Sequence, residues 1–141
     1  AFRLPTGVRL AVAGLRKDQG SGLPTSVVRL SHIAGAEEMA AWYSAADVFI
    51  NPTREDNFPS VDLEALACGT PVAAFDTGGV GEALDDATGR AVRPGDTDAL
   101  LNAALELAEE DCRWACVERA AHLYDGLRRF EEYVDLYESL T

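Results

Sequence analysis

The residues best suited to chemistry lie between positions 51 and 82, in the run NPTREDNFPSVDLEALACGTPVAAFDTGGVGE. Glu55 and Asp56 follow an apolar stretch, and Glu64 comes eight residues after Asp56, inside a helical pattern that opens at Ser60. Amides at a helix start favour an anion such as a diphosphate, whereas a carboxylate one turn later suits the paired hydroxyls of a ribose. The run predicts a site for a phosphorylated, hydroxyl-rich ligand. The competing interpretation is that the first two acids cap the helix and Glu64 is an ordinary exposed acid.

A diglycine, Gly78-Gly79, follows the apolar run PVAAFD, and Glu82 comes shortly after it. Two glycines allow a positive φ or the close approach of the backbone to a ligand. The alternative is an ordinary turn between a strand and a helix. The run GVGEAL is not a dinucleotide fingerprint, because Leu84 stands where the third glycine would allow close helix–strand packing.

Two further groups of residues favour a structural interpretation. Asp96 and Asp98 form an Asp-x-Asp before an apolar-periodic helix, and helix capping accounts for them without a metal. Cys112 and Cys116 lie four residues apart with His122 nearby, but a zinc site needs a fourth ligand that the sequence does not offer. We therefore expect buried thiols rather than a metal site.

The elements that must position these residues alternate along the chain. Short apolar runs predict strands at 8–14, 26–33, 47–53, 71–76 and 89–94. Helical spacing predicts helices at 36–46, 60–68, 96–110 and 112–140. Ser60 can cap the second helix, Gly69 ends it, and the last is broken near Gly126. This alternation predicts an α/β fold, a Rossmann-like doubly wound parallel sheet with helices on both faces, whose ligands bind at the carboxyl ends of the strands.

Length and composition narrow the class of protein. The chain has 141 residues, 48% of them hydrophobic, which predicts a single domain over 1–141 with a real core. A net charge of −12 argues against nucleic-acid binding, and the late acidic run predicts a solvated helix face. No apolar run approaches a membrane span, and an odd count of three cysteines favours a reducing compartment, so we expect a cytoplasmic protein.

The run at 51–82, with EEMAAWYSAADVFINPT upstream, resembles the signature of glycosyl transferases group 1. The match covers about 8–108 and leaves 109–141 as a helical tail. The resemblance implies the C-terminal, donor-binding half of a GT-B-fold retaining enzyme. Its parent would transfer a hexosyl group from a nucleotide-sugar to a glycan or lipid-linked acceptor. The EDNFP wording is similar to a subgroup that builds bacterial exopolysaccharides such as colanic acid.

The resemblance also implies roles for individual residues. The donor sugar and diphosphate are expected to meet Glu55, Asp56, Asn57, Phe58, Pro59, Ser60 and Val61. Glu64 is expected to bind the ribose hydroxyls. The base is expected to be read, mostly by backbone groups, at Ser31, His32 and Ile33. A further loop would contribute Gly78, Gly79 and Glu82. The family has Glu as its first acid, so whether Glu55 or Asp56 reaches the sugar stays open.

The same resemblance implies that some parts lie outside this chain. The family's first βα unit, its phosphate-clamping Arg or Lys, and the N-terminal acceptor domain are expected upstream of residue 1. We therefore expect the isolated chain to be inactive and its open sheet edge to re-pair or self-associate. No catalytic residue is identified, and no cofactor or metal is expected beside a UDP- or GDP-sugar substrate. Any membrane association of the parent is expected to be peripheral, at the inner face of the membrane. A non-catalytic nucleotide-sugar-binding or assembly module and a GT-B-like sugar-nucleotide epimerase are the alternatives.

Overall fold

The computed structural model describes residues 4–15, 22–30 and 33–140. The chain divides into two compact units, Ala1–Met39 and Ala40–Thr141, and each is described by itself. In the first unit, β1 (Ala11–Ala13) pairs in parallel with β2 (Val28–Leu30). Helix α1 (Ala36–Ala45) follows and crosses the border between the units.

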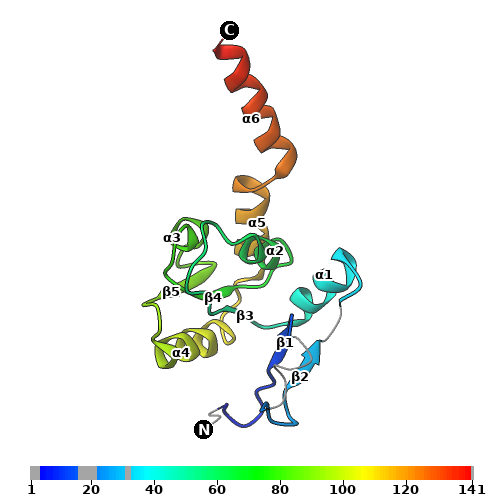
Figure 1. Ribbon diagram of the computed structural model, residues 1–141, viewed down its shortest axis with the longest axis vertical. Coiled ribbons are helices and arrows are strands. Elements are labelled where there is room, and N and C mark those ends of the chain that lie inside the picture. The colour runs from blue at the N-terminus through cyan, green and yellow to red at the C-terminus, as the bar shows by residue number, and fades with distance from the viewer. Residues whose placement is uncertain (1–3, 16–21, 31–32, 141) are drawn as a thin grey trace. The chain divides into compact units, whose positions relative to one another are not determined.

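The second unit is built on a three-stranded parallel sheet in the order β3-β4-β5 (Figure 1). Its strands are β3 (Phe49–Asn51), β4 (Val72–Phe75) and β5 (Gly89–Val92). The central strand, β4, is buried along its whole length, as its unbroken apolar sequence VAAF requires. Asn51 pairs with Ala74 in register, so the carboxyl ends of β3 and β4 meet at one edge.

Helices cover both faces of this sheet (Figure 1). They are α2 (Ser60–Ala67), α3 (Val80–Ala83), α4 (Thr97–Leu107) and α5 (Arg113–Leu123). Helix α4 packs on one face, and α2, α3 and α5 lie on the other. Leu66 on α2 and Leu107 on α4 are both fully buried, so each face of the sheet has its own part of the core. The predicted alternation of parallel strands and flanking helices is confirmed.

The helix ends show which sequence-based capping predictions were right. Asp96 caps α4, since its Oδ1 accepts a 2.9 Å hydrogen bond from the Ala99 amide. Gly69 ends α2 with a φ of +79°, also as predicted. The capping role expected of Ser60 was wrong: Pro59 occupies the cap position of α2, no side chain caps it, and Ser60 is the first helical residue.

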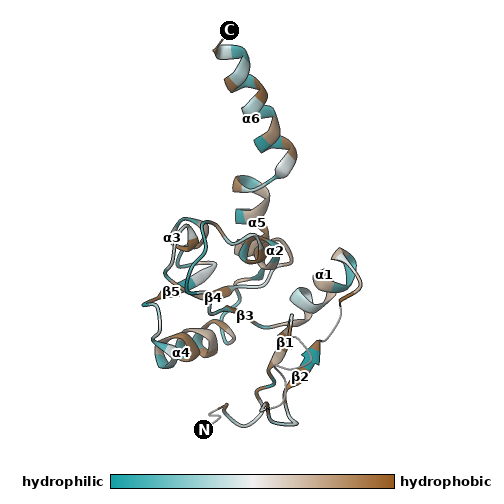
Figure 2. Ribbon diagram, viewed as in Figure 1, coloured by the Kyte–Doolittle hydropathy of each residue, from teal (hydrophilic) through white to brown (hydrophobic). Residues whose placement is uncertain are grey.

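A last helix, α6 (Gly126–Ser139), contains no buried residue. Figure 2 shows hydrophobic and hydrophilic residues side by side along it. Its acidic residues are all exposed, which confirms the predicted solvated face: Glu131, Glu132, Asp135 and Glu138. Large apolar side chains are exposed as well, among them Leu127 and Phe130. Over the described part of the chain, no helix combines the length and apolar character needed to cross a bilayer.

Candidate functional site

The candidate site lies where the three parallel strands of the second unit end. The loops that follow β3, β4 and β5 occupy 52–59, 76–79 and 93–96. Because the strands are parallel, these loops emerge from the same edge of the sheet. Two of the loops carry predicted site residues, and the third had been assigned to capping alone.

The first two loops are in direct contact. The Gly79 amide donates a 2.7 Å hydrogen bond to the Asn57 carbonyl. Gly78 has a φ of +52°, and a Cβ there would overlap the Asp56 carbonyl oxygen. A Cβ on Gly79 would overlap the Phe58 ring. The close approach that a diglycine allows is therefore present, and its partner in this structure is the 56–58 segment.

The 52–59 loop is closed by its own hydrogen bonds. Asp56 Oδ1 accepts from the Phe58 amide at 3.2 Å, and the Thr53 hydroxyl donates to the Glu55 carbonyl at 3.3 Å. Asp56 thus stabilises a turn within the loop rather than capping α2, which rules out the capping interpretation for this acid. The side chains of Glu55 and Asp56 remain exposed at the sheet edge.

Asp62 is a buried acid beneath this loop. Its side chain is fully buried, and its Oδ1 accepts a 2.8 Å hydrogen bond from Asn51 Nδ2. Its Oδ2 is buried without a hydrogen-bond partner in the described structure. Burial raises the pKa of Asp62 to about 6, opposed by the Asn51 hydrogen bond and aided by the charge of Asp56. Asn51 Oδ1 also accepts from the Thr53 amide at 3.2 Å, so this pair ties α2 to the start of the loop.

Sequence reasoning missed Asp62, although a signal for it was present. It precedes the buried Ala65 and Leu66 by three and four residues, which places all three on one face of α2. An acid on the apolar face of a helix predicts a buried partner. The partner itself, Asn51, is eleven residues away and was not recognisable from helical spacing.

Glu64, the predicted ribose ligand, lies on the exposed side of α2. It is close to Tyr43, whose pKa is raised to about 12 by burial first and then by the negative charge of Glu64. The Tyr43 ring meets Phe49 edge to face at 5.2 Å, which holds it in the core. The Glu64 carboxylate is therefore exposed, and its neighbour Tyr43 is held in place by the core.

The start of α2 differs in one respect from the expectation. The amides at the start of this helix were expected to be available to an anion, but the Asp62 amide donates a 3.2 Å hydrogen bond to the Pro59 carbonyl. Pro59 is buried, whereas Ser60 and Val61 are exposed at this end of the helix. The donors that this helix end offers a ligand are therefore fewer than predicted.

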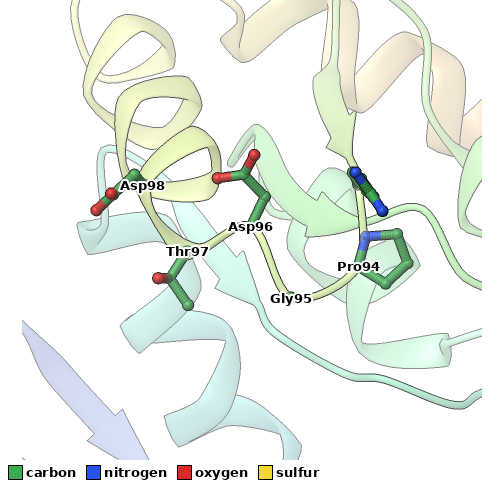
Figure 3. A pocket seen from close by; sticks show the side chains of 6 residues that line it. Pro94, Gly95, Asp96, Thr97 and Asp98 are labelled. Atoms are coloured by element: carbon green, nitrogen blue, oxygen red, sulfur yellow. The ribbon is translucent and has the colours of Figure 1, made fainter.

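The third loop lines a surface hollow between β5 and α4 (Figure 3). The hollow is bounded by residues 93–98, and Gly95 turns the chain there with a φ of +86°. Arg93 at this loop and Arg54 in the first loop are the cationic residues of the three loops. Asp96, shown in Figure 3, is engaged in its capping hydrogen bond.

The predicted base-binding residues are only partly described. Ser31 and His32 lie outside the described residues, and Ile33 is half-buried in the first unit between β2 and α1. Glu82 is exposed, and its backbone carbonyl accepts from Arg119 and Tyr124. Within the described ranges no group of three His, Cys, Asp or Glu side chains is arranged to hold a metal.

Comparison with known proteins identifies the family. Residues 3–110 match the family model described as glycosyl transferases group 1. This chain belongs to that family. Group 1 relatives named D-inositol 3-phosphate glycosyltransferase include one from Xylanimonas cellulosilytica, 37% identical over 143 residues, covering 90% of this chain and 33% of that protein. Another, from Streptosporangium roseum, is 43% identical over 83 residues, covering 58% of this chain and 19% of that protein.

A solved structure shows which part of such an enzyme this group 1 chain corresponds to. Sucrose-phosphate synthase from Thermosynechococcus elongatus superposes with a TM-score of 0.78 at 28% identity, over 94% of this chain and 38% of that one. The fold is that of the C-terminal half of a GT-B glycosyltransferase. The chain spans a fifth to two fifths of the length of these three proteins.

Proposed function

We propose that this chain binds the nucleotide-sugar donor of a retaining glycosyltransferase. The observation that carries the proposal is the 2.7 Å bond from the Gly79 amide to the Asn57 carbonyl. This bond joins two loops that carry separate sequence motifs, both of which were expected to bind the same ligand. The joined loops present the exposed carboxylates of Glu55 and Asp56 beside the start of α2, which carries Glu64.

The charge of each side chain indicates which part of the donor it would bind. Carboxylates accept hydrogen bonds from hydroxyl groups, so Glu64 is assigned to the ribose and Glu55 or Asp56 to the sugar. The diphosphate takes the remaining donors at the start of α2, with Arg54 and Arg93 as the cations on the same edge. In the parent enzyme, charge building up on the leaving diphosphate would be stabilised by such groups, together with cations from outside this chain. The reaction as proposed uses no metal, so chelation with EDTA should leave donor affinity unchanged.

For the parent protein we propose transfer of a hexosyl group to a glycan or lipid-linked saccharide in polysaccharide biosynthesis. The EDNFP run supports this choice of acceptor. The curated relatives are named for D-inositol 3-phosphate, so a cyclitol phosphate is the competing acceptor. We place the protein in the cytoplasm, in keeping with its three free cysteines. Incubating the parent with each acceptor class and a hexose donor, then analysing the products, separates these acceptors.

The first test is an amide-resolved NMR titration of this chain with UDP, GDP, ADP and NAD at millimolar concentration. Shift changes at 57–64 and 78–79 with one nucleoside diphosphate would support the proposal and identify the base. A response to NAD alone would overturn it. Turnover of a nucleotide-sugar without acceptor would favour an epimerase, and binding without turnover by the parent would favour a non-catalytic module.

A further inference from the structure

Helix α5 contributes to the candidate site from outside the region that matches the family. The match ends at residue 110, whereas α5 spans Arg113–Leu123 and is followed by its cap residue, Tyr124. Tyr124 nevertheless contacts Phe58 in the first loop of the site, and both Arg119 and Tyr124 contact α3, which follows the second loop. These partners lie 36 to 66 residues away in sequence, so tertiary structure alone brings them together.

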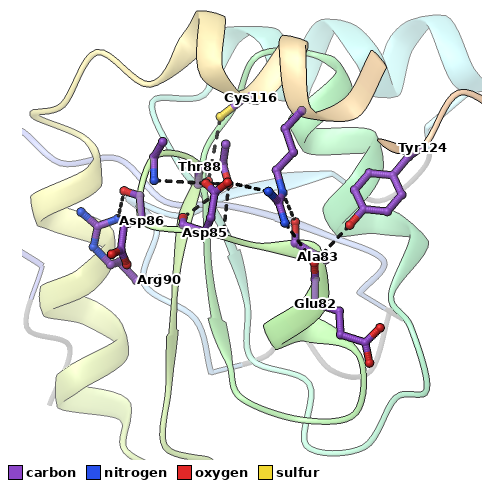
Figure 4. A network of polar contacts seen from close by, with 10 residues as sticks. Glu82, Ala83, Asp85, Asp86, Thr88, Arg90, Cys116 and Tyr124 are labelled. Atoms are coloured by element: carbon purple, nitrogen blue, oxygen red, sulfur yellow. Dashed lines mark hydrogen bonds and ion pairs between the residues drawn. The ribbon is translucent and has the colours of Figure 1, made fainter. Parts of the chain in front are cut away.

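Tyr124 contacts both the 52–59 loop and helix α3, which follows the diglycine loop, with one side chain. Its ring centroid lies 5.9 Å from that of Phe58, with the two planes inclined at 58°. Its hydroxyl donates a 3.2 Å hydrogen bond to the Glu82 carbonyl (Figure 4). The Phe58 ring in turn occupies the space that a side chain on Gly79 would fill. The Tyr124 ring therefore contacts Phe58, and Phe58 in turn lies against Gly79 in the second loop.

Arg119 supports the same arrangement from the neighbouring turn of α5. Its Nε donates to the Ala83 carbonyl at 2.7 Å, its Nη2 donates to the Glu82 carbonyl at 3.0 Å, and Nη1 pairs with Asp85. These carbonyls lie at the end of α3, which is only four residues long. A single helical turn has little stability of its own, so its position depends on such partners. The polar contacts among these residues are drawn in Figure 4.

We propose that Tyr124 is a positioning residue for donor binding: it holds Phe58 and the diglycine loop in the arrangement that receives the nucleotide-sugar. The inference rests on the proposed function of these loops. Phe58 is 39% exposed, so without the Tyr124 ring it has open solvent into which to turn. Losing that ring would free the Phe58 side chain and weaken the bond from Gly79 to Asn57. Arg119 holds α3 in place, and Tyr124 links α3 to the loop that carries Glu55 and Asp56 through its contacts with Glu82 and Phe58.

The test compares Tyr124→Phe, which removes only the bond to Glu82, with Tyr124→Leu, which also removes the ring contact. Tyr133→Leu on α6, where Tyr133 is 63% exposed, is the matched control for losing a tyrosine. Leu107→Ala, on the opposite face of the sheet, is the control for lost stability. Two quantities are measured by NMR well below the unfolding temperature: the dissociation constant for the nucleoside diphosphate that wild type binds, and the exchange rate of the Gly79 amide.

Tyr124→Leu is expected to weaken binding by about fivefold or more and to speed Gly79 exchange, with Tyr124→Phe in between. Neither control should change either quantity. Unchanged affinity and exchange in Tyr124→Leu would overturn the inference while the proposed function stands. An equal loss of affinity in Leu107→Ala would overturn it too, since the effect would then be one of stability. If wild type binds no nucleoside diphosphate, the proposed function fails and the donor-binding role of Tyr124 fails with it.

Discussion

Asn51 and Asp62 form a buried side-chain pair that joins β3 to α2, with Asn51 Nδ2 donating to Asp62 Oδ1 at 2.8 Å. The other oxygen of Asp62 is buried without a partner in the described structure. An unpaired buried oxygen is least costly when the acid holds a proton. The pair lies directly beneath the loop that carries the acids of the candidate site, so its protonation bears on that loop.

The first prediction concerns the pH dependence of stability. The pKa of Asp62 is raised from 3.8 to about 6 in the folded chain, so the folded state holds the proton more tightly than the unfolded state between these values. The free energy of unfolding contributed by this group should therefore fall as pH rises through that window, by at most about 3 kcal/mol. Asp62→Asn cannot ionise and should lack this component. Urea unfolding of both proteins at about pH 4 and about pH 7 measures the difference. If the free energy of unfolding changed equally with pH in wild type and Asp62→Asn, this prediction would be wrong.

The second prediction concerns the diglycine loop. Gly78→Ala should destabilise the chain by more than about 2 kcal/mol, because it combines a left-handed backbone with overlap against the Asp56 carbonyl. Gly95→Ala is the matched control, since Gly95 also has a positive φ but no atom within 4 Å of an added Cβ. It should cost only about 1–2 kcal/mol. Equal losses in thermal or urea unfolding would show that the contact between the loops is not made.

The third prediction concerns Glu64. If it holds the ribose, Glu64→Ala should weaken binding of the nucleoside diphosphate by about 1–3 kcal/mol, as for the loss of hydrogen bonds to a charged group. The control is Glu106→Ala, which removes an exposed acid on α4 and so has the same net charge as Glu64→Ala. This control should bind the nucleoside diphosphate as tightly as wild type does. Calorimetry or NMR titration measures both. Unchanged affinity in Glu64→Ala would remove this residue from the site.

The fourth prediction separates Glu55 from Asp56. Asp56→Asn keeps an oxygen that can accept from the Phe58 amide, so the loop turn should survive. If Asp56 contacts the sugar, this variant should bind the nucleotide-sugar more weakly, by about 1–3 kcal/mol, and the free nucleoside diphosphate normally. Glu55→Gln should then leave both affinities unchanged. The reverse pattern would assign the sugar contact to Glu55, and a loss of affinity for both ligands would indicate a disturbed loop instead.

Much of the fold followed from local sequence. The unbroken apolar run VAAF predicted a strand buried on both faces, and the structure has it as the central strand β4. Asp96 was recognisable as a cap because a cap and its amide partner lie within three residues of each other. The break near Gly126 and the exposed acids of α6 were readable for the same reason. The error at Ser60 was also local, because Pro59 beside it took the cap position.

The sequence by itself therefore determined the strands, the longer helices and the edge at which acids and glycines gather, since these depend on spacings of a few residues, whereas the short helix α3 was not predicted. Only the tertiary structure decided that Asp62 is buried against Asn51, that Gly78 and Gly79 lie against the 56–58 segment, and that Tyr124 reaches Phe58. Each of these contacts joins residues separated by eleven to sixty-six positions. Their physical cause is packing between elements, which helical and strand periodicity do not encode.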